Sequence, residues 1–179
     1  MDLTPDHAYV ADLQEAVRAS IDVAVLAGTQ ELGRASQPIT VLAYDQWAGT
    51  RALPELLAAF SMPNNPAVDV LIGKASKLLR AQHADLQMNG YQSKSRDVVW
   101  KQLSAIYSTL AAESLHYAEP PASFGVDGQK IRTPDRIMEA RVATCLDLAM
   151  LFSSCLEQAG LRPVCLLYTS PSPRDRQKS

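Results

Sequence analysis

The sequence has no large excess of either charge, few cysteines and no long apolar run, and each of these features excludes a class of protein. With 17 Lys and Arg residues against 19 Asp and Glu residues, the formal net charge is -2, so no general basic field draws the chain to nucleic acid or anionic lipid. No apolar run approaches the roughly 18 residues that a membrane helix needs. The first residues lack the basic and apolar regions of a signal peptide. We therefore expect a cytoplasmic protein without membrane contact.

The three cysteines are an odd number and include no CxxC pair. A disulfide framework and a zinc knuckle are therefore not expected, and a reducing compartment is the simplest setting. The sequence also contains no G-x-x-x-x-G-K-S/T motif, which would cradle nucleotide phosphates. We expect neither a metal ion nor another cofactor.

What the sequence does contain is the composition of an ordinary globular protein, with 47% hydrophobic and 20% charged residues in a chain of 179. The periodicity of its apolar residues changes near residue 50, from alternating to helical. We therefore expect an α+β chain in three parts. These are a β-rich segment at 1–50, a mainly helical domain at 51–164 and a tail at 165–179.

The β-rich segment is indicated by a period of two. Ile21, Val23 and Val25 alternate with smaller or polar residues, and a second apolar run follows a proline. A helix over 9–19 is the competing interpretation of the start. We favour strands and interpret residues 1–50 as a partial β-sandwich.

The helical domain shows apolar residues at helical spacing and several helix caps. Ser95 is an expected N-cap, Thr133 precedes a proline at a first helical position, and Gly160 is expected just past the final helix. The predicted elements are helices at 53–60, 67–82, 95–113, 134–140 and 145–159, with a short strand at 115–117 and a loop at 120–128.

The start of the last helix is the most informative stretch. Thr144 occupies the N-cap position, and Asp147 is its expected capping-box partner. Cys145 then lies in the first turn, where unpaired N–H groups and the helix dipole favour a thiolate, the nucleophilic form of cysteine. The same N–H groups are candidates for an oxyanion hole. The carboxylate of Asp147 opposes a thiolate, and a capped helix with a structural cysteine is the alternative.

Other candidates are weaker. The Gln92 amide is a candidate oxyanion donor, although a loop side chain bonded to the backbone is the alternative. Cys155 lies deeper in the last helix and is expected in the core, and Trp47 is expected to be a packing anchor. A basic strip on the second predicted helix is interpreted as a solvated face rather than a nucleic-acid contact. This strip consists of Lys74, Lys77 and Arg80.

The stretch from residue 129 to residue 164 resembles the core motif of transglutaminase-like cysteine hydrolases. In that motif an arginine and a small residue precede the nucleophilic cysteine, which is followed by an aspartate and an apolar helix ending in glycine. The matching positions are Arg141, Cys145, Asp147 and Gly160. Ala143 departs from the motif, which usually has glycine there, and alanine tolerates less backbone freedom.

Segments further upstream resemble the N-terminal region of very large bacterial helicases of superfamily 1. There a β-sandwich-like segment and a transglutaminase-like module precede a domain of unknown function and the helicase core. The resemblance covers most of residues 10–164, and no helicase motif is present in the sequence. The segments that carry it are 45–49, 53–60, 63–64, 90–93 and 117–124.

The tail resembles something other than native protein sequence. The run from Cys165 to Asp175 is similar to the conceptual translation of a transposon-end adapter used to build sequencing libraries. We therefore expect native sequence to stop near Val164, and we exclude the tail from fold reasoning. A native flexible tail rich in serine and proline is the alternative.

The resemblance implies a triad in which a histidine and an aspartate come from two strands after the cysteine helix. Those strands are expected to begin near Arg162 and to be lost where the tail begins. The three histidines, His7, His83 and His116, all lie upstream. The expected fold is thus an incomplete β-sandwich followed by the helical front half of a transglutaminase-like domain, inactive as it stands.

Two functions follow as hypotheses. The first is thiol chemistry on an amide of a protein or peptide substrate, with attack by Cys145, formation of an acyl-enzyme, and hydrolysis or transfer to an amine. The second is a non-catalytic interaction or regulatory module of a nucleic-acid motor protein. The sequence indicates neither the substrate nor an oligomeric state.

Overall fold

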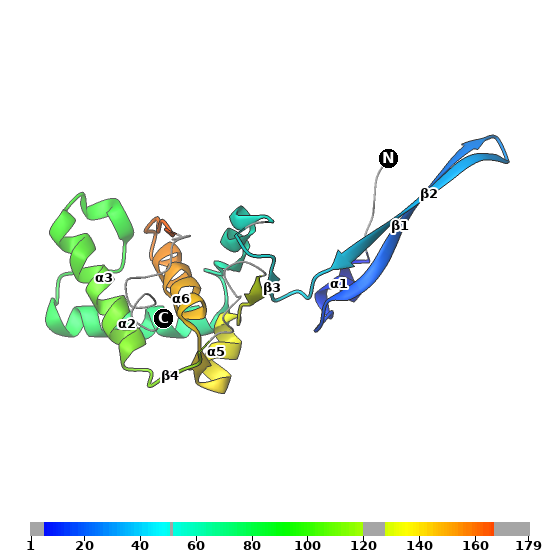
Figure 1. The fold of residues 1–179 in the computed structure, drawn as a ribbon. Helices are drawn as coiled ribbons and strands as arrows, with labels where there is room; N and C mark the ends of the chain where they lie inside the picture. Colours follow the sequence, from blue (N-terminus) through cyan, green and yellow to red (C-terminus); the bar gives the residue numbers. More distant parts are fainter. Residues whose placement is uncertain (1–5, 51, 120–127, 167–179) are drawn as a thin grey trace, which may run out of the picture.

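A computed structural model describes residues 6–50, 52–119 and 128–166, in which a β-hairpin extends away from a helical body (Figure 1). The mixture of helices and strands confirms the predicted α+β class. Most of the predicted loop at 120–128, and the tail beyond residue 166, lie outside the described residues. The elements are α1 (His7–Ala11), β1 (Val17–Ala27), β2 (Gln30–Val41), β3 (Gln46–Trp47), η1 (Pro54–Phe60), α2 (Pro66–Gln82), η2 (Gly90–Ser93), α3 (Arg96–Ala111), β4 (His116–Tyr117), β5 (Gln129–Lys130), α5 (Pro134–Ala140), β6 (Val142–Ala143) and α6 (Cys145–Gln158).

The hairpin of β1 and β2 forms an antiparallel sheet of its own. Its register runs from Val17 opposite Val41 to Ala27 opposite Gln30. Alternate residues of β1 carry its branched apolar side chains on one face, and both strands remain largely exposed. A sandwich requires a second sheet packed on that face. Within residues 6–50 the strands are those of the hairpin and the two-residue β3, and the hairpin forms a two-stranded sheet of its own. The partial sandwich therefore stays a prediction.

The start of the chain divides between the two competing interpretations. Residues His7–Ala11 form α1 because the carboxylate of Asp6 accepts hydrogen bonds of 3.1 Å from the N–H groups of Ala8 and Tyr9. From Val17 onward the chain is a strand, as favoured from the sequence. The sequence pattern did not predict this short helix, because its start depends on a single capping residue, Asp6.

Helices α2, α3 and α6 pack around the main apolar core, to which α5 adds Ile137. Ser95 caps α3 as predicted, accepting a hydrogen bond from the N–H group of Val98 at 3.5 Å. Within α2, Val68 is buried and faces this core, whereas Val70 is exposed. The other fully buried members of this core include Leu71, Ala75, Ile106, Leu151 and Cys155.

A second, smaller core surrounds Trp47, which confirms its predicted packing role. Its ring is buried with Leu57, Ile131, Leu146 and Met150, so β3 and the start of α6 share one apolar cluster. This cluster lies beside the pairing of β3 with β5. The first turn of α6 is therefore fixed by packing as well as by its caps.

Candidate active site

The capping box predicted at the start of α6 is present. The Thr144 hydroxyl accepts a hydrogen bond from the N–H group of Asp147 at 3.2 Å, and the Asp147 carboxylate accepts one from the N–H group of Thr144 at 2.8 Å. Cys145 is the first residue of the helix, and its side chain is exposed. At this position the N–H groups of Cys145 and Leu146 have no acceptor within the helix. The helix therefore presents a thiol and free donors at one point.

Asp147 has a second role that the sequence did not reveal. Its side chain is fully buried, and it accepts two hydrogen bonds of 2.9 Å from the main-chain N–H group and the guanidinium of Arg132. The negative charge that opposed a thiolate is thus compensated by a cation. Asp147 supports the site by joining the segment before α5 to the start of α6.

Tyr117 lies beside Cys145 because β4 and β6 pair in parallel. Tyr117 is opposite Ala143, and the N–H group of Ala118 donates to the Ala143 carbonyl at 2.9 Å. Partial desolvation of the Tyr117 hydroxyl, followed by its interaction with Cys145, raises the pKa of Tyr117. Sequence reasoning predicted the short strand but not its partner, so Tyr117 was missed.

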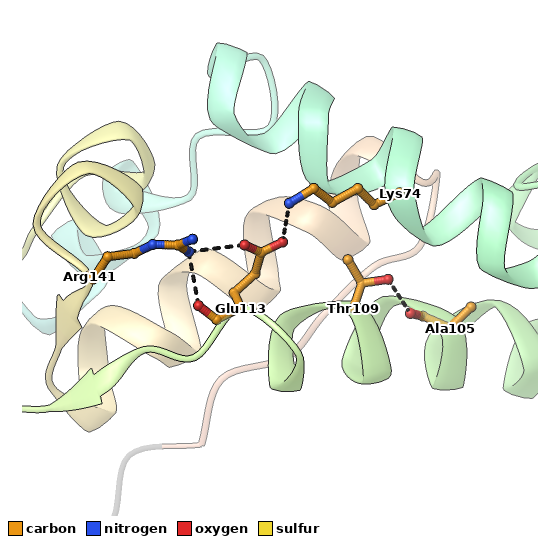
Figure 2. Close-up of polar contacts among 5 residues, drawn as sticks. All are labelled: Lys74, Ala105, Thr109, Glu113 and Arg141. Carbon is orange, nitrogen blue, oxygen red and sulfur yellow. Dashed lines mark hydrogen bonds and ion pairs between the residues drawn. The ribbon is translucent and has the colours of Figure 1, made fainter.

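The carboxylate of Glu113 is buried and lies between two basic side chains (Figure 2). Glu113, at the end of α3, forms ion pairs with Lys74 of α2 and with Arg141, whose guanidinium lies 3.0 Å from the carboxylate. Arg141 also donates to the Glu113 carbonyl at 2.9 Å. The bond from Lys74, followed by that from Arg141, holds the pKa of Glu113 below its ordinary value despite burial.

Arg141 thus stabilises the backbone around the site and does not bond to the thiol. It has a left-handed backbone, with φ of 57°, at the turn from α5 into β6. Its carbonyl accepts a hydrogen bond of 2.8 Å from the N–H group of His116 in β4. Side chain and main chain of Arg141 together fix β4 beside β6, and so fix Tyr117 beside Cys145.

An open apolar groove of about 440 Å³ lies between α3 and α6 and reaches Cys145. We call it the Cys145 groove. Tyr107 and Phe152 meet edge to face across it, with ring centroids 6.3 Å apart and planes at 77°. Its other lining residues are Leu110, Ala111, Leu115, Leu148 and Ala149. The groove therefore offers apolar surface with a nucleophile at its edge.

Gln92 is not near Cys145, so the oxyanion role predicted for it is corrected. Gly90, in the same short helix, packs against Gly160, at the opposite end of α6 from Cys145. Tyr91 also accepts a hydrogen bond from the N–H group of Arg162 at 3.3 Å. Since α6 has 14 residues, its two ends lie about 20 Å apart.

The histidines do not supply a base to Cys145. His116 is next to Tyr117 in β4, and neighbouring side chains in a strand point to opposite faces. His83 is the C-cap of α2, and His7 begins α1.

The remaining cysteines differ from Cys145 in environment. Cys155 is fully buried in the main core, as predicted, and burial raises the pKa of Cys155 to about 12. Cys165 is exposed. No three potential metal ligands cluster within residues 6–50, 52–119 and 128–166. Over the same ranges, none of the helices combines the length and the apolarity needed to cross a membrane.

Comparisons with protein-family models, curated proteins and solved structures found no match to this chain. The candidate site therefore stands on its own geometry. That geometry brings together an exposed thiol at a capped helix start and an apolar groove that reaches it.

Proposed function

We propose that Cys145 is the nucleophile of a transglutaminase-like module acting on amides of a protein or peptide. The observation that carries the proposal is the exposed thiol at the first residue of a capped helix, at the edge of an apolar groove. The compensation of Asp147 by Arg132 supports it, since the carboxylate in the first turn of the same helix is paired with a cation. In the proposal, residues 51–164 form the helical front half of that module, in a reducing cytoplasmic setting.

The chemistry follows from these groups. The Cys145 thiolate attacks the amide carbonyl carbon, and the new oxyanion faces the N–H groups at the start of α6. The C–N bond then breaks, the amine leaves with a proton, and a thioester remains. Water or a second amine attacks the thioester, which restores the thiol. The groove holds an apolar side chain next to the reacting amide.

The proposed mechanism also requires a general base, and none of the described residues is placed beside Cys145 to serve as one. Tyr117 does not fill this role, because its raised pKa keeps it protonated at neutral pH. For the chain as printed we therefore expect a reactive thiol but no turnover of amides. Cys145-dependent hydrolysis of amide or ester substrates by this chain would show that expectation to be wrong.

The test of the nucleophile is the alkylation rate of Cys145. In a Cys165→Ser variant the remaining cysteines are Cys145 and Cys155. Because Cys155 is buried, the rate of alkylation by iodoacetamide reports on Cys145 alone. We expect alkylation at pH 7 to be about tenfold faster than that of a short unstructured peptide containing one cysteine, because the N–H groups and the dipole of the helix start stabilise the thiolate. Cys145→Ala is the control for labelling elsewhere. A rate equal to that of the peptide thiol would overturn the proposal and favour a non-catalytic interaction module.

A further inference from the structure

The hairpin of β1 and β2 has outer edges with which no other strand of the described residues pairs. The two strands form a sheet of their own, which extends away from the helical body (Figure 1). With 11 and 12 residues they are long for a globular protein, and nearly all of their residues are exposed. A hairpin of two strands alone is only marginally stable in water. It therefore has both the length and the free main-chain groups to accept a further strand.

The two outer edges of the hairpin differ, because β2 contains Pro38 opposite Ser20 of β1. A proline has no N–H group, so within a sheet its nitrogen faces away from the neighbouring strand. The outer edge of β2 thus lacks a donor at this point, which blunts it against further pairing. In an antiparallel pair, two opposite residues either bond to each other or both point outward. The N–H and carbonyl groups of Ser20 therefore point outward too, at the free edge of β1.

The charges on β1 are complementary to themselves about Ser20. Arg18 and Asp22 lie two residues before and after Ser20, so the three share one face of the strand and one edge. When a second copy of β1 pairs antiparallel with the first and the two Ser20 residues are opposite, each Arg18 lies opposite Asp22 of the other copy. Arg18 is exposed and forms no ion pair with any residue that the structure describes. It is therefore available for this contact.

Neighbouring registers lack this match. Moving the two copies by one step that preserves the hydrogen bonds places each charge opposite a neutral residue, and a further step places like charges opposite each other. The favoured register pairs residues 17–23 of the two copies. It therefore ends before the irregularity in the hairpin between Val25 and Leu26.

We propose that two copies of this chain associate through antiparallel pairing of their β1 strands about Ser20. The pairing joins both hairpins into one sheet of four strands, with β2 of each copy at the outside. Because opposite residues of an antiparallel pair point to the same face, the apolar residues of both hairpins lie on one side of this sheet. A strand edge buries little surface, so we expect weak association, with half of the chains paired at roughly 100 µM. The inference is independent of the proposed function of Cys145.

The experiment is sedimentation equilibrium of the full chain from about 5 to about 500 µM. A reductant is present because Cys145 and Cys165 are exposed. The variants are Arg18→Asp and Asp22→Arg, each of which places like charges opposite each other twice in the paired state. We expect each variant alone to associate at least about tenfold more weakly than the parent. In an equal mixture of the two variants, opposite charges face each other again, so association should return to the level of the parent.

Arg80→Asp is the matched control, because it changes the net charge by the same amount as Arg18→Asp but lies exposed on α2. It should leave association unchanged. A parent that stays monomeric over the whole range would overturn the proposal. Association that survives both β1 substitutions, or that Arg80→Asp weakens equally, would place the contact elsewhere and also overturn it. A mixture that associates no better than its separate components would contradict the register about Ser20, and recovery in the mixture supports it.

Discussion

The main-chain N–H group and the guanidinium of Arg132 both donate to the carboxylate of Asp147, each at 2.9 Å. The same carboxylate closes the capping box with Thr144. One buried anion thus satisfies three donors and joins the segment after β5 to the helix that carries Cys145. This anion thus fixes the capped start of the helix that carries the candidate nucleophile.

Asp147→Asn should lower the stability of the fold substantially. An amide has one acceptor oxygen and presents an NH₂ group to donors, so at least one of the three bonds is lost inside the protein. The guanidinium of Arg132 is partly exposed and regains water, so the loss comes from the charge-assisted bonds inside the protein, and we expect a decrease of about 2 kcal/mol in the free energy of unfolding. Urea denaturation followed by circular dichroism measures it.

Glu157→Gln is the matched control for that change. Glu157 lies on the same helix, but its side chain is exposed, so its substitution should change the unfolding free energy by less than about 0.5 kcal/mol. Equal effects of the two substitutions would show that the bonds of Asp147 to Arg132 and Thr144 do not stabilise the fold.

Glu113→Gln should destabilise the protein in a pH-dependent manner. The pKa of Glu113 is lowered in the fold, so its ion pairs contribute fully above the unfolded-state value of about 4.3. Lys74 and Arg141 are each about half exposed and regain water when the carboxylate is removed, so we expect a loss of about 2 kcal/mol at pH 7. As the pH falls through the lowered pKa, the parent loses this contribution as well, and the two stabilities should converge.

Unfolding free energies measured at pH 7 and at successively lower pH test the sign of this effect. Glu139→Gln is the control, because Glu139 is exposed and its pairing with Arg136 is long, at 3.7 Å. A difference between parent and Glu113→Gln that grows on acidification would contradict the prediction.

Local sequence signals were sufficient to predict the start of α6. Thr144 and Asp147 are neighbours in sequence, and their mutual bonds require no knowledge of the rest of the fold. Gly160 likewise ends the helix in a left-handed conformation, with φ of 79°. Helix boundaries and the location of the thiol were therefore accessible from the sequence.

Relations between distant segments were not accessible in the same way. The two-residue strand of Tyr117 pairs with β6 through main-chain bonds, which leave no side-chain pattern to read. Gln92 was placed wrongly because its sequence does not say at which end of α6 its loop packs. The hairpin shows the same limit, since alternation predicts an apolar face but not whether a second sheet covers it.

The Cys145 groove should make the thiol selective for reagents with an aromatic group. N-benzyl iodoacetamide carries the same reactive centre as iodoacetamide and adds a ring that the apolar lining between Tyr107 and Phe152 can partly bury. Partial burial of a ring contributes about 1 kcal/mol, so we expect the benzyl reagent to react about fivefold faster with Cys145. The ratio of the two rates, divided by the ratio for a peptide thiol, isolates the contribution of the groove.

Ala149→Glu tests whether that preference arises in the groove. Ala149 is exposed and lines it, so the substitution places a charge on the apolar surface without opening the core, and the benzyl preference should fall toward that of a peptide thiol. Ser153→Glu places the same charge one turn along α6, outside the lining residues of this groove, and should retain most of the preference. A preference that survives Ala149→Glu, or falls equally in both variants, would show that the ring binds elsewhere.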